Sequence, residues 1–181
     1  MTRFIAVEGC HGTGTSTHAD ALAEALRTRG IDAVGWHHPP HPVEAVGAER
    51  VRHYCESRRW ARWLELAEAA HAVYVFDRGP WSGVVYAQSL VSAGETRLLS
   101  GFVGARLEVE LWWDHLQVIC LDAPDDELDA RLAHRGEDPA TSHAERRVWR
   151  RMAAAQEWPV VSTDGDREAV EAQLLALALR P

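Results

Sequence analysis

Short apolar runs alternate along this chain with longer segments whose apolar residues recur every three to four positions. The first kind of segment is typical of buried β-strands and the second of helices packed by one face. Strands joined through helical crossovers lie parallel in one sheet. The pattern therefore predicts a parallel sheet, with strands in a run that starts at Phe4 and at 31–36, 72–76, 116–121 and 158–162.

The segments with helical spacing predict helices at 19–27, 82–91, 97–113, 125–134 and 167–179. A further helix is predicted to begin near Arg146, and most of 43–72 is predicted to be helical, with a break near 56–57. A chain of 181 residues without repeats or linkers fits one domain. The expected fold class is α/β: a single three-layer α/β/α domain over residues 1–181, with a five-stranded parallel sheet and helices on both faces.

Composition narrows the class of protein only a little. Hydrophobic content of 46% and charged content of 25% are ordinary for a globular domain. The net charge of −8 gives no general attraction to nucleic acid, although the arginines are clustered. Three cysteines without metal-type spacing read as reduced thiols. With no membrane-span or signal-peptide pattern, we expect a cytoplasmic protein without a membrane contact.

A glycine-rich turn between the first strand and the first helix carries the strongest chemical signal. Its glycines let successive N–H groups turn toward a phosphate, and the helix points its positive end at the same anion. Ser16 lies where such loops place a Mg2+-binding hydroxyl. Thr15 replaces the usual lysine, and a plain strand-to-helix turn is the alternative. The residues expected to hold donor phosphates are Gly9, His11, Gly12, Thr13, Gly14, Thr15, Ser16 and Thr17.

Two charged residues follow the third strand, at the sheet edge where parallel sheets bind ligands. Arg78 is expected to hold an acceptor phosphate through paired hydrogen bonds, and Asp77 to help hold hydrated Mg2+. An ordinary surface ion pair is the alternative.

Histidines and prolines dominate 37–42, after the second strand. The prolines prevent a helical histidine pair, so a pocket lining or a solvated loop is favoured over a metal site. In the helical stretch that follows, interleaved arginine and tryptophan, Arg58 among them, could stack on a base. Arginine stems that cover the core are the alternative.

Arg131 and Arg135 lie four residues apart, on one helical face. The polar segment 136–141 after them, within about 135–145, suggests a lid, and a second arginine group lies at 146–151. Two arginine sets beside a loop suit closure over transferring phosphates. A solvated helical face is the alternative.

In order along nearly the whole chain, these motifs resemble thymidylate kinases, within the P-loop nucleoside and nucleoside-monophosphate kinases. The motifs are Glu8-Gly9 to Ser16-Thr17, Asp77-Arg78 with Ser82 and Tyr86, Asp114-His115-Leu116 with Leu121 to Pro124, and the lid sequence Arg131 to Glu137. This chain differs from the family pattern at three places. Thr15 stands where the family has a lysine, and His11 where it has an aspartate near the acceptor sugar. Residues 37–44 replace the usual Arg-Glu-Pro-Gly sequence.

The resemblance implies a phosphotransferase that uses ATP and Mg2+. The expected acceptor is a small-molecule nucleotide, first a deoxynucleoside monophosphate. An alternative acceptor is an unusual nucleoside or a hydroxymethylated base in phage DNA. DNA would be a partner of the protein only under this alternative. A non-catalytic nucleotide-binding protein is another, and a homodimer is expected by analogy. The residues expected to act in catalysis are Thr15, Arg78, Arg131 and Arg135. Ser16 and Asp77 are expected to bind Mg2+. The residues expected to bind the acceptor are His11, His38, His41, Glu44, Arg58, Arg78, Tyr86 and Gln88.

Overall fold

The computed structural model describes residues 3–37, 73–79, 81–92 and 116–180. The helices predicted within 43–72 and 97–113 lie outside these ranges, as do His38, His41, Glu44 and Arg58.

The described strands form one parallel sheet in the order β2-β3-β1-β4-β5. Every neighbouring pair in it is parallel, which confirms the predicted sheet. β1 lies at the centre, and all of its residues after Arg3 are buried. The strands are β1 (Arg3–Gly9), β2 (Ala33–His37), β3 (Val73–Asp77), β4 (Leu116–Asp122) and β5 (Val160–Ser162).

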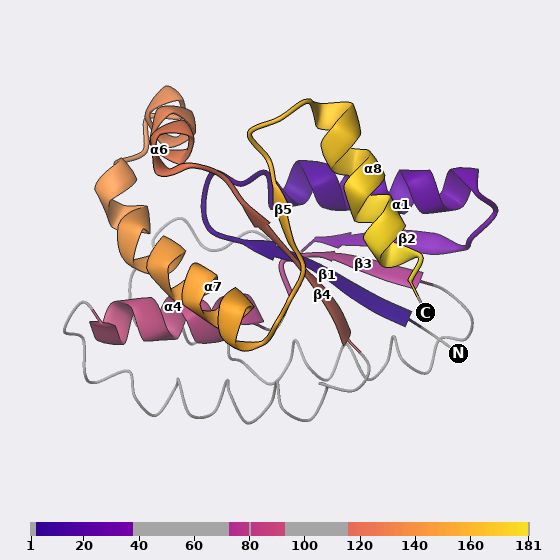
Figure 1. The fold of residues 1–181 in the computed structure, drawn as a ribbon, viewed down its shortest axis with the longest axis horizontal. Coiled ribbons are helices and arrows are strands. Elements are labelled where there is room, and N and C mark those ends of the chain that lie inside the picture. The colour runs from indigo at the N-terminus through magenta and orange to yellow at the C-terminus, as the bar shows by residue number, and fades with distance from the viewer. Residues whose placement is uncertain (1–2, 38–72, 80, 93–115, 181) are drawn as a thin grey trace.

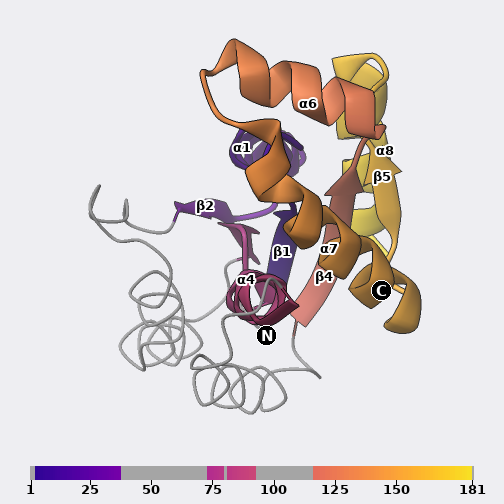
Figure 2. The same cartoon turned by 90° about the vertical axis from the view of Figure 1, so that its left-hand side faces the viewer.

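Helices cover both faces of the sheet, so the predicted three-layer architecture is confirmed. α1 and α8 lie together on one face, and α4 and α7 on the other (Figure 1). Figure 2 shows α7 extending from the end of α6 toward α4. The described helices are α1 (Thr15–Thr28), α4 (Trp81–Ser92), α6 (Asp125–His134), α7 (His143–Ala155) and α8 (Arg167–Ala178), with a short 3-10 helix, η3 (Pro139–Ser142).

The spacing of apolar residues in α1 explains its place in the core. Ala19, Leu22 and Leu26 recur on one helical face and are buried against Ile5 of β1 and Leu174 of α8. The helix ends as the glycine pattern predicts: Gly30 takes φ +76, and the N–H of Ile31 donates to the Leu26 carbonyl at 3.1 Å.

Several boundaries differ from the sequence prediction: α1 already begins at Thr15, and the differences at β5 and α7 have a structural cause. β5 is shorter than 158–162, because Trp158 instead turns into the layer of α4 and α7, where its ring centroid lies 5.0 Å from that of Trp81. α7 begins at His143 rather than near Arg146, because Glu145 is already buried in its first turn. The region predicted as a lid therefore contains η3 and the start of α7.

Cys10 and Cys120 are buried free thiols. Within the described part of the chain, no helix is both long and apolar enough to cross a membrane.

Candidate active site

The loop between β1 and α1 has the backbone geometry of an anion-binding turn. Gly12 and Gly14 take φ values of +92 and +80, which favour glycine. A Cβ on Gly9 would lie 2.5 Å from the Thr13 Oγ1, so this position also requires glycine. The Thr13 hydroxyl donates to the Cys10 carbonyl at 2.8 Å and closes the turn. The loop thus leads into the first turn of α1, whose N–H groups have no helical partners of their own.

Thr15 is the first residue of α1, and it is buried. Where the loop pattern has a lysine, this side chain adds a small hydroxyl and no positive charge. Thr17 follows in the same turn with an exposed side chain.

Ser16 and Asp77 meet at the carboxyl edge of the sheet, as predicted for a Mg2+ site. The Ser16 hydroxyl donates to Asp77 Oδ2 at 2.5 Å, and His37 Nδ1 lies 3.1 Å from the same oxygen. The other oxygen, Asp77 Oδ1, is buried and has no hydrogen-bond partner among the described residues. One unpaired carboxylate oxygen beside a hydroxyl fits Mg2+, which binds one or two carboxylates together with phosphates and water.

His37 links this pair to α1. Its Nε2 lies 2.7 Å from Asp20 Oδ1, and the hydrogen bond to Asp20, followed by that to Asp77, raises the pKa of His37 despite partial burial. Asp20, His37 and Asp77 do not form a metal cluster: the described ranges contain no group of three or more His, Cys, Asp or Glu suited to a metal ion.

Arg78 lies beside the loop in an unusual backbone conformation, with φ +62. Its N–H donates to the Val7 carbonyl at 3.0 Å, which fixes it at the end of β3. Its guanidinium Nη1 donates to Glu145 Oε1 at 3.2 Å, and the second oxygen of Glu145 pairs with His11 Nδ1. The structure therefore brings the predicted residues Arg78 and His11 together on one carboxylate from α7.

Glu145 was not predicted from the sequence. Burial would raise the pKa of this carboxyl, but the nearby charges of His11 and Arg78, with their hydrogen bonds, outweigh it and lower the pKa to about 2. The only sequence signal was an acidic residue directly before the arginine group at 146–151.

Glu8 was also missed, and it explains the serine of the Asp-Arg-x3-Ser motif. The Ser82 hydroxyl donates to Glu8 Oε2 at 2.6 Å, and the Trp81 N–H donates to Glu8 Oε1 at 3.1 Å. Glu8 is fully buried, and burial raises its pKa to about 7. This carboxyl therefore ties the segment after Arg78 to the central strand.

Gly79 packs tightly in this segment, and its replacement by alanine should destabilise the fold. A Cβ there would lie 2.7 Å from the Ala6 Cβ and 3.1 Å from Glu8 Oε1. Overpacking of this kind costs about 1–3 kcal/mol, so thermal unfolding of Gly79→Ala should shift down by several degrees. Gly165→Ala is the control, since nothing lies within 4 Å of its added Cβ. Equal melting temperatures for the two variants would contradict the tight packing.

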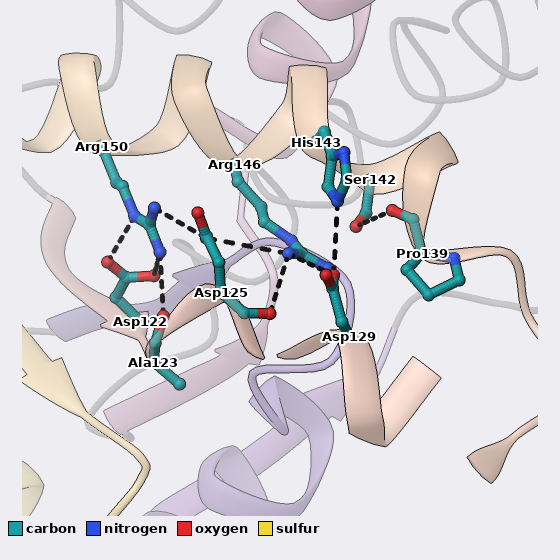
Figure 3. Close-up of polar contacts among 9 residues, drawn as sticks. All are labelled: Asp122, Ala123, Asp125, Asp129, Pro139, Ser142, His143, Arg146 and Arg150. Carbon is teal, nitrogen blue, oxygen red and sulfur yellow. Dashed lines mark hydrogen bonds and ion pairs between the residues drawn. The ribbon is translucent and has the colours of Figure 1, made fainter. Parts of the chain in front are cut away.

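Two arginines of the group at 146–151 bind acidic residues within the fold (Figure 3). Arg150 Nε donates to Asp122 Oδ2 at 2.8 Å, and its Nη1 lies 2.8 Å from Asp125 Oδ1. Arg146 is buried, with its Nη1 2.7 Å from Asp129 Oδ1. These bonds hold α7, and with it Glu145, against α6 and the end of β4.

The two arginines predicted to stabilise the migrating phosphoryl group lie in different surroundings. Arg131 Nη1 donates to the Gly12 carbonyl at 3.2 Å, and its Nη2 donates to the Thr163 carbonyl at 2.6 Å. Arg135 follows the end of α6, half-exposed, and pairs with Glu137 at 3.1 Å. The structure brings Arg131 onto the phosphate-binding loop but not Arg135, and their part in transfer stays a prediction. Gln88 is half-buried on α4, and Tyr86 lies on the same helix.

A central parallel strand, a glycine turn and a helix that starts at the turn define a P-loop nucleotide-binding domain. A sequence model for the family described as "AAA domain" matches residues 5–154, and the chain belongs to this family.

Within that class, the chain is similar to a thymidylate kinase from Rhizorhabdus wittichii, with 45% identity over 67 residues. The match covers 37% of this chain and 31% of that protein, so the chain spans about a third of its curated relative. The predicted likeness to thymidylate kinase-type P-loop kinases is thereby confirmed.

Proposed function

We propose that this protein transfers the γ-phosphoryl group of ATP to a nucleotide-like acceptor. The observation that carries the proposal is the meeting of Ser16 and Asp77 beside the glycine loop, with Arg78 next to them. A glycine loop alone would support nucleotide binding, whereas the added carboxylate and arginine support transfer.

Each part of the site has a role in this proposal. Backbone N–H groups of 12–16 bind the donor phosphates, and Ser16 and Asp77 hold Mg2+. Mg2+ supplies positive charge to the phosphate oxygens during transfer. Phosphoryl transfer depends on positioning and electrostatics. Arg131, which bonds the loop at Gly12, is therefore suited to supply part of the charge that a lysine would give.

The acceptor lies on the Arg78 side of the loop in this proposal. The relative's name, thymidylate kinase, supports a deoxynucleoside monophosphate. Arg78 would then bind the acceptor phosphate, in competition with Glu145. His11, His38, His41, Glu44, Arg58, Tyr86 and Gln88 remain the proposed lining of the pocket.

ADP formation by the purified protein, with Mg2+ and a panel of nucleoside monophosphates, nucleosides and base-modified DNA, tests the proposal. Acceptor-dependent ADP formation is expected. Measurable ATP affinity without turnover on any member of the panel would instead support a non-catalytic nucleotide-binding protein.

Replacing Thr15 by lysine should raise the rate of transfer. The new ammonium would add a charged hydrogen bond to the outer phosphates, a contribution of about 1.5–3 kcal/mol or roughly 10- to 150-fold in rate. Thr28→Lys adds the same charge at the far end of α1 and serves as the control. Steady-state kcat should rise in the first variant and not in the second, and equal kcat values for Thr15→Lys and wild type would contradict a role for that missing charge.

A further inference from the structure

The pair formed by His11 and Glu145 has an arrangement suited to proton transfer. Glu145 lies in the first turn of α7 and is buried, while the His11 side chain is 28% exposed. One carboxylate oxygen of Glu145 meets His11 Nδ1 and the other meets Arg78 Nη1. Both oxygens are therefore engaged, and the imidazole is held in one orientation.

The protonation state of Glu145 decides which nitrogen of His11 is basic. Although burial raises the pKa of Glu145, its hydrogen bond with His11 and the adjacent Arg78 guanidinium hold that pKa below its usual range, so Glu145 is ionised near neutral pH and can only accept hydrogen bonds. His11 Nδ1 must then carry the proton of this hydrogen bond. In the neutral imidazole, Nε2 is consequently the nitrogen with a free lone pair. A carboxylate that fixes the tautomer of a histidine and stabilises its protonated form is the arrangement of an oriented general base.

The position of His11 places this base at the proposed site of transfer. It lies inside the phosphate-binding loop, between Gly9 and Gly12, and shares Glu145 with Arg78. A base is required only for some acceptors. A phosphate acceptor is already ionised at neutral pH, whereas an alcohol must lose its proton as the new bond forms.

The charges around His11 also favour an uncharged acceptor. Among the described residues, the charged groups that bond or pair with it directly or through Glu145 are Glu145 itself and Arg78. Glu145 and Arg78 carry opposite charges. A dianionic phosphate on Arg78 would lie close to the Glu145 carboxylate, whereas a hydroxyl group would meet no such repulsion.

We infer that the acceptor is an alcohol, the hydroxyl group of a nucleoside or of a hydroxymethylated base in DNA. His11 is its general base, and Glu145 is the positioning residue. This inference rests on the proposed function and names the acceptor chemistry of the same site.

The reaction balances without any further reactant. The acceptor oxygen forms a bond to the γ-phosphorus of ATP, and its proton passes to His11 Nε2. The bond from the γ-phosphorus to the β,γ-bridging oxygen breaks, and ADP leaves with that electron pair. His11 then releases the proton to water, and the product is a phosphate monoester.

The test offers three acceptors to the wild-type protein with ATP and Mg2+: thymidine, a DNA duplex that contains 5-hydroxymethyluracil, and thymidine monophosphate. Phosphate-ester formation on either alcohol is expected. Comparing thymidine with the modified DNA duplex shows whether the acceptor is a free nucleoside or a base in DNA. His11→Gln should lower kcat on that alcohol by roughly 100-fold or more, with little change in the KM for ATP. Arg29→Gln, at the exposed C-terminal end of α1, is the control and should keep the wild-type rate.

The division of the effect between kcat and KM separates a base from a structural residue. With the alcohol acceptor, the loss in His11→Gln should appear in kcat, with the KM for the alcohol nearly unchanged. Glu145→Gln should also lower kcat more than it changes KM, because the imidazole loses the carboxylate that orients it. Circular dichroism checks that Glu145→Gln is folded, and the His11→Gln variant keeps the test decisive if it is not.

Phosphorylation of thymidine monophosphate alone would overturn the inference and leave the proposed function standing. Alcohol phosphorylation with an unchanged kcat in His11→Gln would also overturn it. Absence of transfer to all three acceptors would overturn both the inference and the proposed function.

Discussion

Replacement of Asp77 by asparagine is expected to lower Mg2+-dependent transfer by roughly 100-fold, the equivalent of about 3 kcal/mol of transition-state stabilisation. Asp77 Oδ1 is buried without a hydrogen-bond partner in the described residues, and Oδ2 accepts from Ser16. An asparagine of the same shape keeps one oxygen but loses the negative charge that holds Mg2+. The initial rate should be measured across a Mg2+ titration, where the half-saturating concentration should rise.

Asp20→Asn is the matched control for this variant. Asp20 bonds the other nitrogen of the same histidine, His37, but its side chain is 63% exposed and, within the described part of the chain, forms no hydrogen bond or ion pair with Ser16 or Asp77. It should keep the wild-type Mg2+ dependence. If both variants lose activity equally, the hydrogen-bonded chain through His37 matters and Asp77 has no separate role with the metal.

Folding stability is expected to fall as the pH rises from about 4.5 to about 7, because of Glu8. Burial raises the pKa of Glu8 from 4.5 to about 7, so in this range the folded state holds a proton that the unfolded state has released. The contribution of protonated Glu8 to the free energy of unfolding is fully present below the pKa of Glu8 in the unfolded state. It is lost as the pH rises through the pKa of Glu8 in the folded state, and the total loss is up to about 3 kcal/mol. Urea unfolding at several pH values measures it.

Glu8→Gln should lack this part of the pH dependence, because glutamine cannot titrate. The comparison is the difference in unfolding free energy between variant and wild type, since other groups titrate in both. Glu24→Gln, on an exposed side chain of α1, should leave the wild-type slope unchanged. A Glu8→Gln curve parallel to that of wild type would show that Glu8 is charged in the folded protein near neutral pH.

The fold was predictable because its signals are local. The apolar run of β1, the glycine turn and the apolar positions Ala19, Leu22 and Leu26 of α1 each specify an element without reference to distant residues. Parallel connections then restrict the arrangement to a sheet with helices on both faces. β5 was predicted too long because the course of Trp158 depends on the tryptophans it packs against.

The carboxylates of the site could not be predicted in the same way. Glu145 meets His11 across 134 positions of sequence, and Glu8 meets Ser82 across 74. Nothing in the local pattern around either residue indicates its partner. Ser16 and Asp77 were predicted together because both lie at the carboxyl ends of parallel strands, which meet at one edge of the sheet. That prediction requires no knowledge of which distant residues are in contact.

For the arginines at 146–151, the sequence suggested a ligand-binding role, whereas the structure shows two of them in ion pairs within the fold. Their clustering suggested a surface that closes over phosphates, but Arg146 and Arg150 pair with Asp125, and each also pairs with a further aspartate, Asp129 or Asp122. Those acidic partners lie 17 to 28 positions earlier, across the turn that includes η3. Cation clustering alone does not distinguish a ligand site from the anchoring of a helix.

The measurement that tests the central claim most directly follows the label of γ-labelled ATP with the wild-type protein, Mg2+ and the acceptor panel. Appearance of the label in a phosphate ester of the acceptor, abolished when Mg2+ is chelated, is the result this account predicts. Label that remains in ATP, or that appears only as inorganic phosphate with every acceptor, would contradict phosphoryl transfer at this P-loop.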